Sequence, residues 1–409
     1  MDKKRLVLIL IFTLFCFAIG FILYKIFFAG SFGEQKNIEQ QPVRNTTSTR
    51  ATLPTAGERT QGRQETGQST LPLTGGTRDI DTEELTGQGT VQQVVETSII
   101  APKIQSDGTV TFYNKQDGRF YIVNANGELE LLSDEVFFNV QNVTWSPKEN
   151  KSIIEYPDGS NISYDFSTKK QVTLPKQWEE FSFESEGKSI AAKNITVSPE
   201  NRSLITANPE GNNIRIIAGL GENASRVNVN WSPNKQIIAT SRTGEALGAD
   251  RQEILFVGLN GENFRSLVVE GRGFQDKWSP EGQKLLYSVY SARSEFKPEL
   301  WIVDANPDTI GNERKLLNVN TWPEKCSFSE ERFIYCGVPI VLPVGAGIAP
   351  GVADSSEDAI YRIDTETGIK TEIALQTSDH VIESMFVGDD GKTLFFTDKR
   401  KPGLFKIPL

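Results

Sequence analysis

The sequence predicts an all-β protein: a seven-bladed β-propeller preceded by one transmembrane helix and a disordered linker. Two observations predict the propeller. From about residue 91 the chain consists of short β-type runs cut by turns. Beyond that residue a single unit recurs, in which an apolar strand end leads through Ser-Pro or an equivalent and an acidic or Gly turn into another apolar strand. The corners begin near residues 107, 146, 185, 232, 279, 329 and 388. Their mean period of about 47 residues is typical of a four-stranded propeller blade.

The corners are clearest where a tryptophan precedes the Ser-Pro pair, at Trp145, Trp231 and Trp278. Proline fixes φ for a turn and glycine supplies a positive φ, so each copy is expected to be a hairpin corner. Six blades are the alternative, because Ser198-Pro199 offers a second corner in the third repeat. Even spacing between the neighbouring corners favours Ser185.

Ring closure follows from the last repeat. Residues 382–387, 392–397 and 404–407 supply three strands before the chain ends, so the blade lacks a fourth. A spare β-type run at 91–95 precedes the first blade. We expect this run to pair into the last blade, because such pairing removes two open sheet edges at once.

The corner motif and its period resemble the WD40-like repeats of the TolB-type propeller family, over roughly residues 91 to 409. The layout also resembles uncharacterised single-pass, membrane-anchored propeller proteins of bacteria. The resemblance implies a propeller and little about chemistry, because this scaffold hosts many functions. TolB itself is a soluble periplasmic protein with a separate α/β domain. No such domain is evident here, so the partners of TolB are not expected.

Residues 1–29 are predicted to form a short cytoplasmic stub and a transmembrane anchor. A basic start, Lys3-Lys4-Arg5, precedes an almost wholly apolar run from Leu6 to Phe28 that is interrupted only by Lys25. As a helix this run spans roughly 34 Å, enough for a hydrocarbon core of about 30 Å. Because positive charge stays in the cytoplasm, we expect the N-terminus inside and the propeller outside, at the cytoplasmic membrane.

A cleaved secretory signal is the alternative for this segment. Such a signal has a shorter apolar region followed by small residues, whereas Phe27 and Phe28 occupy that place here. Residues 30–90 then form a linker rich in Thr, Gly, Gln and Ser. This composition cannot bury enough apolar surface to offset chain entropy, so the linker is predicted to be disordered. The propeller is assigned to residues 91–409.

Composition argues against several classes of function. The net charge of -10 would repel a nucleic-acid backbone, so no nucleic-acid partner is expected. The single histidine, His380, excludes a zinc site built from several histidines, and we expect it to be a solvated or a loop residue. No Gly-x-Ser-x-Gly elbow is present, and the acidic turns lack the ligand spacing of a calcium loop. We therefore assign no catalytic, cofactor-binding or metal-binding residue.

Two cysteines flank the corner of the sixth blade. A turn at residues 329–332 would pair Phe328 with Phe333 and leave Cys326 and Cys336 close to opposite one another. Cross-strand Cβ atoms lie about 4.5–5.5 Å apart, near the reach of a disulfide. Outside the cytoplasm such a bond persists. Two buried free thiols are the alternative.

The sixth blade also carries the longest insertion, Gly337–Asp358, which is apolar and rich in Gly and Pro. That composition is not expected to form a strand pair, and long loops on rigid scaffolds often bind partners. The candidate binding residues are Val338, Pro339, Leu342, Pro343 and Ile348. The alternative is a loop that packs against the propeller or plugs its tunnel. The connection 242–251 is a weaker candidate of the same kind.

The leading functional hypothesis is a membrane-tethered, extracytoplasmic and non-catalytic docking module. Its partner would be a protein or a polymer of the cell envelope. One alternative is a cell-wall or carbohydrate-binding protein, including a glycan-active enzyme that uses two carboxylates. Another is the extracytoplasmic input domain of a membrane complex, which requires a transmembrane partner.

Overall fold

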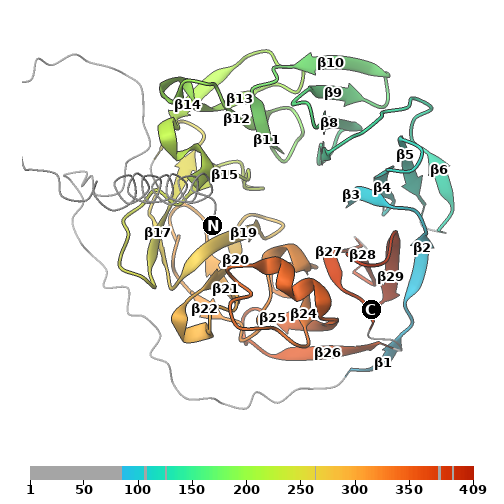
Figure 1. The fold of residues 1–409 in the computed structure, drawn as a ribbon, viewed down its shortest axis with the longest axis vertical. Coiled ribbons are helices and arrows are strands. Elements are labelled where there is room, and N and C mark those ends of the chain that lie inside the picture. The colour runs from blue at the N-terminus through green and yellow to red at the C-terminus, as the bar shows by residue number, and fades with distance from the viewer. Residues whose placement is uncertain (1–84, 106–107, 125–126, 263, 376–378, 389–390) are drawn as a thin grey trace, which may run out of the picture. The chain divides into compact units, whose positions relative to one another are not determined.

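The computed structural model describes residues 85–409 except 106–107, 125–126, 263, 376–378 and 389–390. These residues form seven β-sheets placed around a common centre, which is a seven-bladed propeller (Figure 1). The prediction of seven blades is confirmed, and the alternative of six is wrong. The predicted transmembrane segment and most of the predicted linker lie outside the described residues. Among the residues that are described, no helix is long and apolar enough to cross a membrane.

The strands follow chain order within each blade. Blade one contains β3 (Ile99–Ile104), β4 (Val110–Asn114), β5 (Arg119–Val123) and β6 (Leu129–Leu131), and blade two β7 (Asn142–Trp145), β8 (Lys151–Glu155), β9 (Asn161–Asp165) and β10 (Lys170–Leu174). Blade three contains β11 (Trp178–Phe183), β12 (Ile190–Asn194), β13 (Ser203–Ala207) and β14 (Arg215–Gly219), and blade four β15 (Val227–Val229), β16 (Ile237–Ser241), β17 (Gln252–Gly258) and β18 (Leu267–Val269). Blade five contains β19 (Arg272–Trp278), β20 (Lys284–Tyr290), β21 (Glu299–Asp304) and β22 (Lys315–Leu316). Blade six contains β23 (Cys326–Phe328), β24 (Phe333–Pro339), β25 (Asp358–Asp364) and β26 (Lys370–Leu375), and blade seven β27 (Ile382–Val387), β28 (Thr393–Asp398) and β29 (Leu404–Pro408). The first strand of each blade lies nearest the centre (Figure 1).

The recurring corners join the first and second strands of the blades. In blade three the corner follows β11 at Glu184, whereas Ser198 lies between β12 and β13, next to the short 3-10 helix η2 (Pro199–Asn201). Two of the corner serines have the same local role. The Oγ of Ser232 accepts a hydrogen bond from the N–H of Ile237 at 3.0 Å, and that of Ser279 from Lys284 at 2.9 Å. The serine thus closes the turn that its proline begins.

The tryptophans of the corner motif link neighbouring blades. Trp145 Nε1 donates a hydrogen bond to the Ala101 carbonyl in β3 at 2.7 Å, and Trp278 Nε1 to the Asn230 carbonyl just after β15 at 3.0 Å. In both cases the acceptor belongs to the preceding blade. The third copy differs, since Trp231 Nε1 donates within its own corner, to Lys235, at 3.3 Å. The rings are buried between blades, which is why the repeat retains a large apolar side chain there.

The ring closes as predicted. Strand β2 (Gln92–Val95) pairs antiparallel with β29, and Val95 lies opposite Leu404. Val95 is buried with Val110 and Phe112 of blade one, so the closing strand contributes to the core that blades one and seven share.

A further strand falls inside the predicted linker. Leu85–Gly89 form β1, which pairs parallel to β26 and makes blade six five-stranded. The assignment of residues 30–90 to a disordered linker therefore extends too far. Composition missed this strand because an edge strand can be held by backbone hydrogen bonds, which need no apolar side chains.

Candidate functional site

The two ends of the propeller carry different connections. Because antiparallel strands alternate in direction, the turns between first and second strands lie on one face. The connections between second and third strands lie on the opposite face, together with those between blades. We call this opposite face the loop face. It carries the connections 195–202, 242–251, 291–298 and 340–357 and the inter-blade segments 220–226 and 317–325.

The predicted binding insertion of blade six is shorter than expected. Strand β24 continues through Val338 and Pro339, which pair with Ala359 and Asp358 of β25. The expectation that Gly337–Asp358 forms no strand pair is wrong at its two ends, because the ladder between β24 and β25 extends past the Gly337 at which we placed the loop. Val338 is half-buried and Pro339 buried, so these two candidates belong to the blade rather than to an exposed loop.

The remaining connection contains an uninterrupted apolar stretch. No charged or polar side chain occurs from residue 340 to residue 352. Leu342 packs inward against Trp322, Ala346 and Ala353, whereas Pro343 is exposed. We call the uncharged stretch 340–352 the apolar loop. Five of its large aliphatic side chains face solvent: Ile340 (56% exposed), Val341 (68%), Val344 (68%), Ile348 (60%) and Val352 (42%).

The apolar loop is held by blade five. The N–H of Gly345 donates to the Glu295 carbonyl at 2.9 Å, and that of Gly347 to the Phe296 carbonyl at 2.7 Å. A Cβ at Gly347 would lie 2.6 Å from the Cβ of Tyr290, so only glycine fits this approach. The base of the loop therefore packs against the propeller, as the alternative hypothesis predicted. Its outward side chains are exposed, as the binding hypothesis requires.

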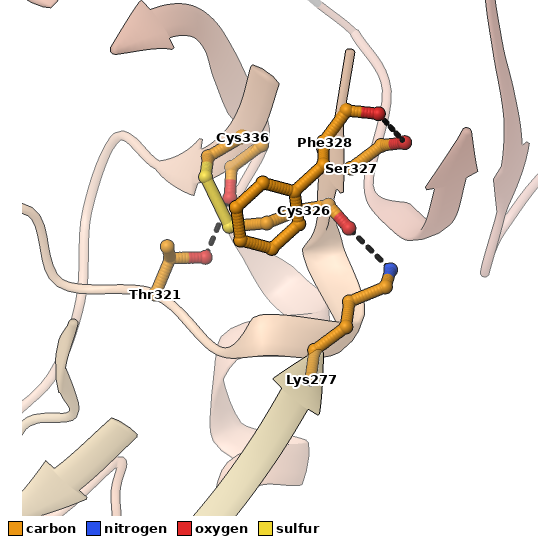
Figure 2. The surroundings of a disulfide bond; sticks show 7 residues. Lys277, Thr321, Cys326, Ser327, Phe328 and Cys336 are labelled. Carbon is orange, nitrogen blue, oxygen red and sulfur yellow. Dashed lines mark hydrogen bonds between the residues drawn. A yellow bond between two sulfur atoms is a disulfide. The ribbon is translucent and has the colours of Figure 1, made fainter. Parts of the chain in front are cut away.

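Cys326 and Cys336 form a disulfide between β23 and β24, with their Cα atoms 4.1 Å apart (Figure 2). The register differs by one residue from the expected one. Phe328 pairs with Ile334 rather than with Phe333, which sets the two cysteines directly opposite. Both are fully buried in the core that blades five and six share. Figure 2 also shows Lys277 of β19, whose Nζ donates to the Cys326 carbonyl.

A cavity that sequence reasoning missed opens on the loop face between blades three and five. Its volume is about 540 Å³, and β15 and β19 supply much of its wall. Asp276 accepts hydrogen bonds from Asn228 Nδ2 at 3.1 Å, Asn230 Nδ2 at 3.2 Å and Thr240 Oγ1 at 3.2 Å. Burial raises the pKa of Asp276, and these hydrogen bonds together with Arg242 oppose the rise.

Charged groups of both signs surround this carboxylate. Glu180, Arg226, Arg242, Lys277 and Glu324 all line the cavity. Burial lowers the pKa of Lys277 to about 8. No local motif announces this arrangement, because the residues come from several blades and connections that are far apart in the chain. The available signal was a polar residue between apolar ones in β15 and three consecutive polar residues, 275–277, in β19. Such polar residues also occur in any strand with one solvated face.

His380 lies in the loop before β27, as expected, but it is buried rather than solvated. Its Nδ1 lies 2.9 Å from Asp398 Oδ2, and its ring packs against Phe396 and Phe405. The Asp398 carboxylate also accepts the backbone N–H of Val381 at 3.0 Å. These contacts give the histidine a structural role at the start of blade seven. Among the residues that the structure describes, no three or more His, Cys, Asp or Glu side chains are grouped so as to hold a metal ion.

The chain matches no family model and no curated protein sequence. Solved structures do share its fold. An oligogalacturonate lyase in complex with manganese has a TM-score of 0.56 at 16% identity, covering 81% of this chain and 96% of that chain. The tricorn protease has a TM-score of 0.50 at 12% identity, covering 80% of this chain and 34% of that chain. TolB from Acinetobacter baumannii has a TM-score of 0.41 at 14% identity, covering 67% and 62%. At these identities the similarity to the lyase and to the tricorn protease shows the fold alone.

Proposed function

We propose that this propeller is a non-catalytic docking module and that a partner protein binds it through the apolar loop of blade six. The observation that carries the proposal is the contrast between this loop and the rest of the chain. Charged residues make up 23% of the sequence, yet none occurs from residue 340 to residue 352. A concentrated, exposed aliphatic surface on a soluble domain is typical of an interaction site.

The surroundings of the apolar loop support the same proposal. Ion pairs flank it, with Lys399 and Asp354 2.7 Å apart and Lys297 and Glu295 also 2.7 Å apart. An apolar centre inside a charged rim is the usual anatomy of a protein interface. The hydrogen bonds to blade five hold the loop in place, so binding costs little conformational entropy.

The location proposed for this module is the outer side of the cytoplasmic membrane. The buried disulfide supports an oxidising compartment. The basic and then apolar N-terminal sequence supports an anchor. A disordered linker over residues 30–84, as the composition predicts, would have a reach on the order of 40 Å, which favours a partner in the same membrane or close to it.

Site-specific photocrosslinking tests the proposal in cells that naturally produce the protein. A photoreactive amino acid at Val344 is expected to yield an adduct with one discrete protein. The matched control is Val197, which is 98% exposed in the connection 195–202 of the same face and is expected to yield none. Val341→Asp together with Ile348→Asp should abolish the adduct, because both side chains are exposed and the charges disrupt the apolar surface without disturbing the core.

Two outcomes contradict the proposal. One is equal crosslinking from positions 344 and 197, which would mean that the apolar loop has no special affinity. The other is crosslinking from Val344 to lipid in vesicles that contain only this protein, which would mean that the loop contacts the bilayer instead of a partner.

A further inference from the structure

A second cavity of about 420 Å³ adjoins the first on the loop face and shares Ser225, Arg226 and Arg242 with it. Arg226 ends the 3-10 helix η3 (Gly221–Arg226), Arg242 follows β16, and Arg272 begins β19. These three arginines line the cavity, and no acidic side chain is among its lining residues. We call it the arginine cleft. It concentrates positive charge on a chain whose net charge is -10.

These guanidinium groups lack ion-pair partners among the described residues, although Glu180, Asp276 and Glu324 line the adjoining cavity. Among the described residues, none of the three arginines forms an ion pair with an Asp or Glu side chain. Asp276 in the adjoining cavity is attracted by Arg242, but its oxygens are already engaged by Asn228, Asn230 and Thr240. Arg226 is exposed, and Arg242 and Arg272 are half-buried.

Two of the arginines are oriented by backbone carbonyls. Arg242 Nη2 donates to the Ser225 carbonyl at 2.8 Å. Arg272 donates through Nε to the Ala249 carbonyl at 3.0 Å and through Nη2 to the Gly248 carbonyl. A guanidinium carries five N–H donors, so both groups keep donors for a ligand. Preorganised donors of this kind lose little freedom when a ligand binds.

Close backbone packing holds the walls of the arginine cleft. Gly273, beside Arg272, has φ +68°, and a Cβ there would lie 2.2 Å from a ring carbon of Tyr290. A Cβ at Gly244 would lie 2.6 Å from the Glu253 carbonyl oxygen. Neither position accepts a side chain without rearrangement. These contacts fix β19 and the connection 242–251, and with them Arg272 and Arg242.

We propose that the arginine cleft binds the anionic group of an acidic sugar, either a carboxylate or a phosphate. The planar guanidinium matches both groups through paired hydrogen bonds. Ser225, Gln252, Asn228 and Gln275 in the two joined cavities offer hydroxyl and amide partners for sugar hydroxyls. Both volumes fall in the range of roughly 300–1,000 Å³ that small-molecule sites occupy. The proposal does not depend on the docking function, because the arginine cleft lies on blades three to five rather than on blade six.

Calorimetric titration of the full-length protein in a neutral detergent tests this proposal. The probes are glucuronate, glucose 6-phosphate, inorganic phosphate and glucose. We expect at least one acidic sugar to bind, with an affinity that falls as salt is added, and glucose not to bind. Glucuronate binding identifies a carboxylate sugar, and glucose 6-phosphate binding identifies a phosphorylated one.

Arg226→Gln is the decisive variant, because this exposed side chain forms no hydrogen bond with the described residues and its loss leaves the fold intact. Its affinity for the acidic sugar should fall by about tenfold or more, as expected for the loss of a charge-assisted hydrogen bond. Arg242→Gln should also lower the affinity for the acidic sugar. Arg215→Gln, at an exposed arginine of the outer strand β14, removes the same charge elsewhere and should change nothing.

Three results overturn the proposal. The first is no binding of either acidic sugar, and the second is equal affinities of Arg226→Gln and Arg215→Gln. The third is binding of a control probe as tight as that of the acidic sugars. Equally tight binding of glucose would mean that the anionic group is not recognised, and equally tight binding of inorganic phosphate would mean that the sugar is not recognised.

Discussion

Lys325 and Asp358 form an ion pair that is fully buried, with Nζ 2.9 and 2.8 Å from the two carboxylate oxygens. Lys325 ends the 3-10 helix η5 (Pro323–Lys325), and Asp358 begins β25. The carboxylate also accepts the N–H of Ile382 in β27 at 2.7 Å, so the pair joins blades six and seven. Burial raises the pKa of Asp358, and the charge of Lys325 opposes that rise.

Lys325→Met should lower the free energy of unfolding by about 3–5 kcal/mol, because it leaves Asp358 buried without its partner. Lys399→Met is the control, since its pair with Asp354 is partly exposed. That change should cost no more than about 1 kcal/mol. Urea unfolding followed by tryptophan fluorescence measures both. Equal losses in the two variants would contradict the role assigned to Lys325.

Loss of the disulfide should destabilise the propeller moderately. Cys326 and Cys336 are 10 residues apart. A disulfide that closes a loop of this size reduces the entropy of the unfolded chain and stabilises the folded protein by about 2–3 kcal/mol. The double substitution Cys326→Ala and Cys336→Ala should therefore lower the free energy of unfolding by that amount. Urea unfolding of the oxidised protein provides the reference.

Alkylation tests the bond itself. The chain has three cysteines, and the third is Cys16. Under denaturing conditions without reductant, intact mass should show one alkylated cysteine, and after reduction three. Three alkylated cysteines before reduction would exclude the disulfide.

Removal of the closing strand should open the ring. Deletion of residues 1–90 removes β1 and everything before it but retains β2, and it should leave the thermal midpoint within a few degrees of the original. Deletion of residues 1–96 also removes β2 and its buried Val95. We expect this second truncation to lower the midpoint by about 5–10 °C, the effect of losing a few kcal/mol. Similar midpoints for the two proteins would show that β2 does not close the ring.

Alkaline pH should deprotonate the buried Lys277 ammonium and so remove the free-energy cost of burying its charge. Burial lowers its pKa to about 8 from an ordinary 10.5. Between these values the unfolded chain binds more protons than the folded one, so this group adds stability as pH rises. Below about 8 the cost of the buried charge is fully present.

The difference in unfolding free energy between the original protein and Lys277→Met should therefore shift in favour of the original protein between pH 7.5 and 10. The expected shift is on the order of 2 kcal/mol. Lys235→Met, at a lysine that is 46% exposed, is the control and should show no such trend. A pH-independent difference for Lys277→Met would mean that its ammonium is hydrated in the folded state.

The elements that were predicted correctly rest on local chemistry. The Ser-Pro corners, their period and the spare strand at 91–95 led to seven blades and to the closure of the ring. The elements that were missed or misplaced depend on pairing partners. Val338 and Pro339 became strand residues because β25 continues beside them, and Cys326 met Cys336 through a turn one residue longer than expected.

The sequence by itself determined the repeating architecture of this protein, because turn residues and apolar periodicity act within a few positions of one another. It also marked the apolar, Gly- and Pro-rich insertion Gly337–Asp358 as a candidate binding loop. Only the tertiary structure decided which of those side chains face solvent, and it alone brought Arg226, Arg242 and Arg272 to one cleft. These residues belong to different blades and connections, and a cleft between them exists only once the ring has closed.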